Sequence, residues 1–272
     1  QRVVKAAAGP GATSLTLADG REIEAALCIA AEGRQSPLRD AAGIKTIGWS
    51  YAQTGIVATI AHEREHKGVA HELFLPSGPF AILPMTGKRS SIVWTERNDL
   101  APAFLKMGDE AFAAEVAKRF GDHWGWTRPE GPRWSYPLSL HLALSYTAPR
   151  LALAGDTAHG IHPIAGQGLN LGLRDVAALA EVLVEAKRLG LDIGSPAVLA
   201  RYQSWRRFDN VVLAASTDVL NRLFSNSFTP LALARRFGLD LVDSIPPLKR
   251  LFMRHAGGAV GELPRLLRGE AL

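Results

Sequence analysis

A glycine-rich stretch between an apolar run and a helical pattern constrains this chain most. Residues 151–173 read LALAGDTAHGIHPIAGQGLNLGL, with five glycines from Gly155 to Gly172. LALAG (151–155) predicts a short buried strand, and the residues from Gly168 onward predict a helix. Glycine lets the backbone approach a ligand closely, and the free N–H groups of a first helical turn carry partial positive charge. The stretch therefore predicts a strand, a ligand-binding loop and a helix N-terminus.

The predicted helix has one apolar face. Its members are Leu169, Leu173, Val176, Ala180 and Leu183. Asp156 follows the predicted strand directly, where an ionised carboxylate could accept hydrogen bonds from sugar-like hydroxyls. A site for phosphate alone would not favour that carboxylate, so we expect a ligand with both a polyol and an electron-poor ring.

Composition excludes several classes of protein. The length of 272 residues fits one large domain or two closely packed ones. The single cysteine, Cys28, excludes an internal disulfide and fits a reducing, cytoplasmic compartment. No apolar run approaches the roughly 20 residues of a membrane span. The charge of +5 mixes 31 basic with 26 acidic residues, without the aromatic–basic interleaving of nucleic-acid binding.

The order of predicted elements indicates two interleaved domains. Residues 14–33 predict a hairpin with a turn at Asp19-Gly20 that leads into a buried strand, and residues 49–94 predict an antiparallel sheet. A helical pattern follows, with Gly108-Asp109 as a helix start, and Ser195-Pro196 begins a helical region that extends to the end. We expect domain segments at 1–47, 48–147, 148–190 and 191–272.

The sequence GDTAHGIHPIAGQGLNLGLRDVAALA resembles the flavin-binding GD motif of the class A, aromatic-hydroxylase FAD monooxygenases. The resemblance implies that Asp156 binds the ribityl chain of FAD. It also implies that the helix dipole near Gly168 stabilises negative charge on the reduced flavin. The other residues carried over to the cofactor site are Gly155, Pro163, Gly166, Gln167, Leu169 and Asn170.

A second stretch, AAEGRQSPLRDAAGI (30–44), resembles the DG motif of the same family. In the family this motif serves the FAD pyrophosphate and the pyridine nucleotide. Gly33, Ser36 and Arg39 match it, whereas Glu32 stands where the family has aspartate. The implied fold is α/β: an FAD-binding layer of the aromatic-hydroxylase (GR2) type with a parallel sheet, interleaved with an antiparallel-sheet substrate domain and a helical C-terminus.

Further segments resemble the ubiquinone-biosynthesis hydroxylases of this family: HELFLPSGPFAILPM, YQSWRRFDN, TDVLNRLFSN, GLDLVDSIPPLKR and RHAGG. The resemblance implies that NADH or NADPH reduces FAD, that O₂ adds at flavin C4a, and that the hydroperoxide hydroxylates a polyprenylated phenol. No catalytic residue is assigned, because the flavin carries the chemistry. We assign no metal, since His159 and His162 lack further ligands at suitable spacing.

The family's N-terminal GxGxxG fingerprint does not occur in these residues. The chain also begins without methionine, so we expect it to be the C-terminal part of the enzyme. Alone, it should lack FAD and hydroxylase activity, residues 156–168 should be mobile or rearranged, and its exposed sheet should be covered in a homo-oligomer or by a displaced helix. A related FAD oxidoreductase without oxygen transfer and a non-enzymatic subunit remain alternatives.

Residues 246–272 mix apolar and basic side chains, as in a surface that binds anionic lipid. They include Leu248, Lys249, Arg250, Leu251, Phe252, Met253, Arg254, Arg265 and Arg268. We expect either peripheral association with the inner face of a membrane or a helix packed on the protein itself. A complex of ubiquinone-biosynthesis proteins is a further expected partner.

Overall fold

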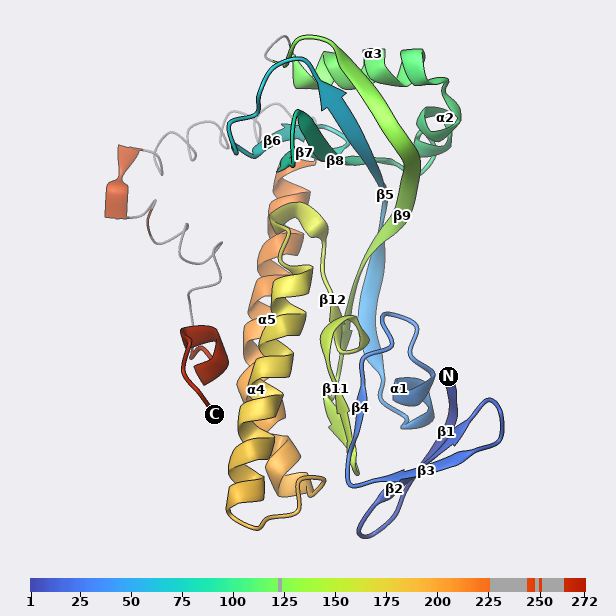
Figure 1. Cartoon of the computed structure of the whole chain (residues 1–272), viewed down its shortest axis with the longest axis vertical. Coiled ribbons are helices and arrows are strands. Elements are labelled where there is room, and N and C mark those ends of the chain that lie inside the picture. The colour runs from blue at the N-terminus through green and yellow to red at the C-terminus, as the bar shows by residue number, and fades with distance from the viewer. Residues whose placement is uncertain (122–123, 226–243, 248–249, 251–261) are drawn as a thin grey trace. The chain divides into compact units, whose positions relative to one another are not determined.

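A computed structural model describes residues 1–121, 124–225, 244–247, 250 and 262–272 (Figure 1). The chain forms two compact units, one of residues 1–49, 139–218 and 245–272 and the other of residues 50–138 and 219–244. Two of the boundaries between the units fall inside strands of 17 residues each, β5 (Thr46–His62) and β9 (Thr127–Ala143). The units are therefore interleaved in sequence. The expected segment ends at 47, 147 and 190 stay predictions.

The first unit begins with a three-stranded antiparallel sheet, β1 (Val3–Ala8), β2 (Thr13–Leu17) and β3 (Glu22–Ala25). The β2–β3 hairpin turns at Asp19-Gly20, as predicted, and the N–H of Arg21 donates to the Asp19 side chain at 3.2 Å. The strand that follows, β4 (Cys28–Ala30), is only partly buried, because Ile29 is 48% exposed.

A second small sheet carries the predicted strand of residues 151–155. Its order is β10-β11-β4, with β10 at Thr147–Ala148 and β11 at Leu151–Leu153. β11 pairs in parallel with β4, in the register Leu151–Cys28 to Leu153–Ala30, and in antiparallel fashion with β10. Among the described residues, the predicted parallel sheet therefore consists of one parallel strand pair, β4 and β11. Because parallel strands end at the same edge of a sheet, the loops after β4 and β11 leave this sheet together.

Two long helices of the first unit lie side by side, α4 (Gly168–Arg188) and the part of α5 (Pro196–Phe224) that belongs to this unit (Figure 1). α5 starts at the proline that follows Ser195, as predicted. The side chains of Leu153, Leu179, Val182 and Tyr202 lie in one core cluster with those of β4 and β11. This packing anchors α4 and α5 to the small sheet.

The apolar face predicted for α4 is only partly buried, because Leu183 packs against the core cluster whereas the first three residues of the face are exposed. Leu169, Leu173 and Val176 are 75%, 51% and 57% exposed. The inward face instead carries Leu171, Ala178 and Val182, together with the fully buried Asp175. Because this inward face carries a buried carboxylate and several alanines, the hydrophobicity pattern of the sequence does not identify it.

The second unit contains the predicted antiparallel sheet. β5 pairs with β8 (Arg89–Arg97), β8 with β7 (Gly78–Met85), and β7 with β6 (His71–Leu75), all antiparallel. One sheet face forms a core with α2 (Ala101–Lys106) and α3 (Asp109–Phe120), in which Trp94 and Phe112 are fully buried. α3 begins after Gly108, as predicted.

The described part of the C-terminus ends in a short 3-10 turn, η4 (Arg265–Arg268). Most of the residues named in the membrane prediction lie outside the described residues: Leu248, Lys249, Leu251, Phe252, Met253 and Arg254. The predicted helical region from residue 226 onward lies largely outside them as well. Within the described part of the chain, no helix combines the length and apolar character of a membrane span.

Candidate cofactor-binding site

The two stretches that resemble flavin motifs lie against each other in the first unit. The N–H of Gly33 donates to Oγ1 of Thr157 at 3.1 Å, and this hydroxyl lies 3.2 Å from the Gly33 carbonyl oxygen. Nη1 of Arg39 donates to the carbonyl oxygens of Arg34 (2.9 Å) and Thr157 (3.2 Å). Residues more than 100 positions apart in sequence therefore form one loop pair.

Glu32, which stands where the family has aspartate, contacts the short helix α1 (Pro37–Ala41). Its Oε2 accepts hydrogen bonds from the Ser36 hydroxyl at 2.5 Å and from the N–H of Leu38 at 3.3 Å. Ser36 is the N-cap, and its hydroxyl oxygen accepts the N–H of Arg39 at 3.1 Å. Ser36 and Arg39 are both buried and hold the loop together. Any contact of theirs with a cofactor remains a prediction.

Asp156 lies in a 3-10 turn, η2 (Gly155–Thr157), directly after β11, and its side chain is 47% exposed. Nε of Arg34 donates to Oδ2 of Asp156 at 3.2 Å. Nε2 of His141 lies 2.7 Å from the Asp156 carbonyl oxygen, which can only accept, so this nitrogen carries the proton. Burial lowers the pKa of His141. The carboxylate is thus held on one oxygen and open to a ligand.

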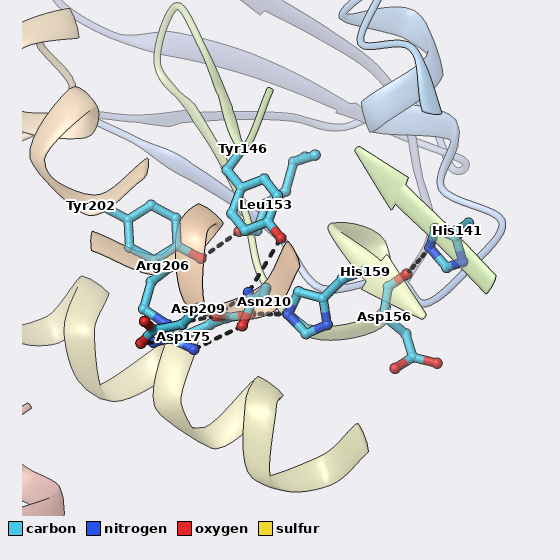
Figure 2. A network of polar contacts seen from close by, with 11 residues as sticks. His141, Tyr146, Leu153, Asp156, His159, Asp175, Tyr202, Arg206, Asp209 and Asn210 are labelled. Carbon is cyan, nitrogen blue, oxygen red and sulfur yellow. Dashed lines mark hydrogen bonds and ion pairs between the residues drawn. The ribbon is translucent and has the colours of Figure 1, made fainter. Parts of the chain in front are cut away.

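A buried carboxylate, that of Asp175, lies among His159, Arg206 and Asn210 (Figure 2) and also holds the residue before Asp156. Oδ2 of Asp175 accepts the backbone N–H of Gly155 at 3.0 Å and Nε2 of His159 at 2.5 Å. Its Oδ1 accepts Nε of Arg206 at 3.0 Å and Nδ2 of Asn210 at 3.2 Å. Burial alone would raise the pKa of Asp175, but the His159 hydrogen bond and the Arg206 charge outweigh it and lower this pKa. The carboxylate therefore stays ionised.

The same network reaches the core beneath the loop. Nδ2 of Asn210 also donates to the Tyr146 hydroxyl oxygen at 3.2 Å, and the Tyr202 hydroxyl donates to the Leu153 carbonyl oxygen at 2.7 Å (Figure 2). Burial raises the pKa of both Tyr146 and Tyr202 well above the usual value, so both hydroxyls stay neutral. α4, α5 and the end of β11 are thereby joined by hydrogen bonds.

Between Asp156 and α4 the chain forms β12 (His159–Gly160) and a second 3-10 turn, η3 (Pro163–Ala165). β12 pairs with residues 141–142 of β9. Nδ1 of His162 accepts the N–H of Ile164 at 3.1 Å, and burial lowers the pKa of His162 to about 4, so the ring is neutral at pH 7. No group of three or more His, Cys, Asp or Glu within the described ranges could hold a metal.

Left-handed backbone or close contacts account for three of the five glycines, Gly155, Gly160 and Gly166. Gly155, at φ 60°, faces Gly172, and a Cβ on Gly172 would lie 3.5 Å from the Gly155 Cα. A Cβ on Gly160 would lie 2.6 Å from the His141 ring, and Gly166 has the left-handed φ of 61°. Gly168 differs, because it is helical and a Cβ there would meet nothing within 4 Å. The fold therefore makes no demand for glycine at position 168.

The N-terminus of α4 is open to a ligand at this glycine. The side chain of Gln167, the N-cap, does not cap the backbone of the first turn; its Oε1 accepts Nδ2 of Asn170 at 3.1 Å. Pro163, Gly166, Leu169 and Asn170 are exposed. The first-turn N–H groups favour an acceptor or partial negative charge. The site thus contains a carboxylate that can accept hydrogen bonds from hydroxyl groups and a helix N-terminus that begins with glycine.

This fold and loop pair define a flavin-binding domain of the aromatic-hydroxylase type. The model of the family described as FAD binding domain matches residues 4–209, and the chain belongs to this family. It is 58% identical over 95% of its length to a ubiquinone hydroxylase of Rhodospirillum rubrum, of which it covers 61%. It is 36% identical over 89% of its length to the mitochondrial ubiquinone biosynthesis monooxygenase of Homo sapiens, of which it covers 59%.

A solved structure supports the fold assignment. The p-nitrophenol 4-monooxygenase of Pseudomonas putida superposes with a TM-score of 0.74 over 92% of this chain and 64% of its own, at 18% identity. The resemblance predicted from the two motifs and the downstream segments is confirmed. The chain spans about three-fifths of the length of these curated relatives.

Proposed function

We propose that this chain forms the flavin-holding and substrate-domain part of a flavin-dependent monooxygenase. The enzyme would hydroxylate a polyprenylated phenol in ubiquinone biosynthesis, with O₂ as co-substrate and NADH or NADPH as reductant. The observation that carries the proposal is the pairing of exposed Asp156 with Gly168, a helix-start glycine that the fold does not require. The names of the two ubiquinone-pathway relatives support the substrate class.

The residues present fit FAD. Asp156 offers an ionised acceptor to the ribityl hydroxyls, and the first turn of α4 offers N–H groups to the electron-rich edge of the ring. Gly168 lets the ring approach the backbone without meeting a Cβ. When bound, FAD supplies the electron transfer and oxygen chemistry.

The remaining predicted residues divide by exposure. Pro163, Gly166, Leu169 and Asn170 are exposed around the α4 N-terminus and would line the cofactor. Gln167 orients Asn170 through their side-chain hydrogen bond. Gly33 and Arg39 act through Thr157, which they hold in place. Gly155 acts through its contacts with Asp175 and Gly172.

The reaction is tested with the complete protein encoded by the gene, FAD, NADH or NADPH, and a short-chain prenylated phenol. We expect phenol-dependent oxidation of the reductant and a product that carries one oxygen atom from labelled O₂, detected by mass spectrometry. Oxidation of the reductant with no oxygen in the product would favour a related FAD oxidoreductase. Absence of both flavin and turnover would favour a non-enzymatic subunit.

We also propose that residues 246–272 contact a membrane surface or a partner of the ubiquinone-biosynthesis complex, on the cytoplasmic side. A polyprenyl substrate requires access to lipid, which supports the idea. Arg268 forms an ion pair with Glu270 at 3.0 Å, and Arg265 lies 3.8 Å from the same carboxylate. Flotation with anionic vesicles at low salt should show binding that salt weakens; no binding would exclude the lipid surface.

A further inference from the structure

The side chain of Arg34 joins three segments at Asp156. Its Nε donates to Oδ2 of Asp156 at 3.2 Å. Its Nη1 donates to both the carbonyl oxygen and the hydroxyl of Ser139, each at 2.8 Å. Nη2 lies 3.4 Å from the carbonyl oxygen of Ile161. A guanidinium held by two other segments restricts where the Asp156 carboxylate can lie.

Gly160 makes room for this arrangement. A Cβ at position 160 would lie 2.9 Å from Cζ of Arg34 and 2.6 Å from the ring of His141. His141 in turn holds the main-chain carbonyl of Asp156 at 2.7 Å. The backbone and the side chain of Asp156 are therefore fixed by different residues, and both of these need a glycine beside them.

We propose that Arg34 is a positioning residue for Asp156 that prepares its carboxylate for a ligand rich in hydroxyl groups. Arg34 occupies Oδ2 and leaves Oδ1 to accept a hydroxyl proton, so less side-chain freedom is lost when the ligand binds. This inference rests on the proposed function, because it takes the ribityl chain of FAD as that ligand. Neither sequence motif assigns Arg34 a role.

The ion pair itself contributes little to folding. The side chains of Arg34 and Asp156 are 36% and 47% exposed, and exposed ion pairs stabilise proteins only weakly. Replacing Arg34 also removes its hydrogen bonds to Ser139 and Ile161, and we expect the loss of FAD affinity, unlike any loss of stability from these bonds, to depend on Asp156. This difference separates a positioning role from a structural one.

A double-mutant cycle in the complete protein tests the proposal, with FAD affinity measured by quenching of flavin fluorescence. The variants are Arg34→Gln, Asp156→Ala and the pair together. We expect Arg34→Gln to weaken FAD binding roughly tenfold in the parent and to have no further effect once Asp156 is alanine. Arg21→Gln is the matched control, since Arg21 forms an exposed ion pair with Asp19 at 2.9 Å.

The outcomes separate this inference from the proposed function. An unchanged FAD affinity in Arg34→Gln would overturn the inference, as would an equal loss in the two Asp156 backgrounds, which indicates a structural effect. If Asp156→Ala itself leaves FAD binding unchanged, the proposed function fails first. Urea unfolding of each variant checks that the fold survives.

Discussion

The carboxylate of Asp175 accepts the backbone N–H of Gly155 at 3.0 Å, so a buried charge on α4 fixes the residue that precedes the exposed Asp156. The same carboxylate is held by His159, Arg206 and Asn210. A buried ion that loses its partner is costly, which makes this network the structural support of the loop.

Replacing Asp175 by asparagine should destabilise the protein. The change leaves the guanidinium of Arg206, which is fully buried, without its main counter-charge. We expect a loss of about 3–5 kcal/mol in the free energy of unfolding, measured with urea. Asp209→Asn is the control, because Asp209 also pairs with Arg206, at 2.9 Å, but is 23% exposed. Equal effects of the two changes would contradict the central position of Asp175.

Gly168→Ala should separate folding from cofactor binding. A methyl group at this position meets nothing within 4 Å, and alanine is the better helix former by up to about 1 kcal/mol. We expect unchanged or slightly higher stability together with FAD binding weakened at least about tenfold, because the methyl group would occupy the space of the ring.

Gly172→Ala is the matched comparison for Gly168. Its Cβ would lie 3.5 Å from the Gly155 Cα. This distance is an ordinary van der Waals contact, so Gly172→Ala should leave both stability and FAD affinity close to those of the parent. If Gly168→Ala binds FAD as well as the parent protein does, the flavin does not approach the start of α4 as proposed.

The stability of the first unit should fall as the pH falls through the range between about 6.5 and about 4. The pKa of buried His162 is lowered to about 4 in the folded state, whereas an unfolded histidine titrates near 6.5. The unfolded state therefore binds more protons in this range, and stability is greatest above the unfolded pKa. Each pH unit should cost at most about 1.4 kcal/mol from this residue.

Urea unfolding at pH 7, 6 and 5 measures this slope. In His162→Asn, the asparagine oxygen can still accept the N–H of Ile164, which His162 accepts at 3.1 Å, but the side chain does not titrate. The variant should therefore show a shallower slope. An identical slope in both proteins would show that His162 does not carry the effect.

The 272-residue chain by itself should be isolated without FAD and without hydroxylase activity. It spans about three-fifths of its curated relatives and contains no GxGxxG fingerprint. On the proposed assignment, residues 155–170 would contact only the ribityl and ring portions of FAD, so much of the binding energy should be absent. Stoichiometric FAD in the purified chain, measured by absorbance, would contradict this expectation.

The sequence predicts local elements well where turn chemistry and caps are explicit. The Asp19-Gly20 hairpin, the start of α3 at Asp109 and the start of α5 at Pro196 follow from glycine or proline signals. Of the residues named from the motif resemblance, Asp156, Pro163, Gly166, Leu169 and Asn170 are exposed, whereas Gln167 and Arg39 are buried. The inward face of α4 was missed because Asp175 is buried only together with its partners.

Residues distant in sequence were also missed at the site. Arg34 and His141 contact Asp156 although they lie 122 and 15 residues away from it in the sequence. Neither a periodic pattern nor a helix-capping motif in the sequence predicts these contacts. The one sequence feature related to these contacts is Gly160, because the absence of a side chain there leaves space for both Arg34 and His141. The sequence alone does not predict which side chains pack beside this glycine.

The most direct test of the central claim is the FAD dissociation constant of Asp156→Ala in the complete protein. The side chain is exposed, so the fold should survive, while the ribityl chain loses hydrogen bonds to a charged group worth roughly 1.5–3 kcal/mol each. We expect the dissociation constant to rise at least about tenfold, with the urea midpoint unchanged. An unchanged dissociation constant would show that Asp156 does not hold the cofactor.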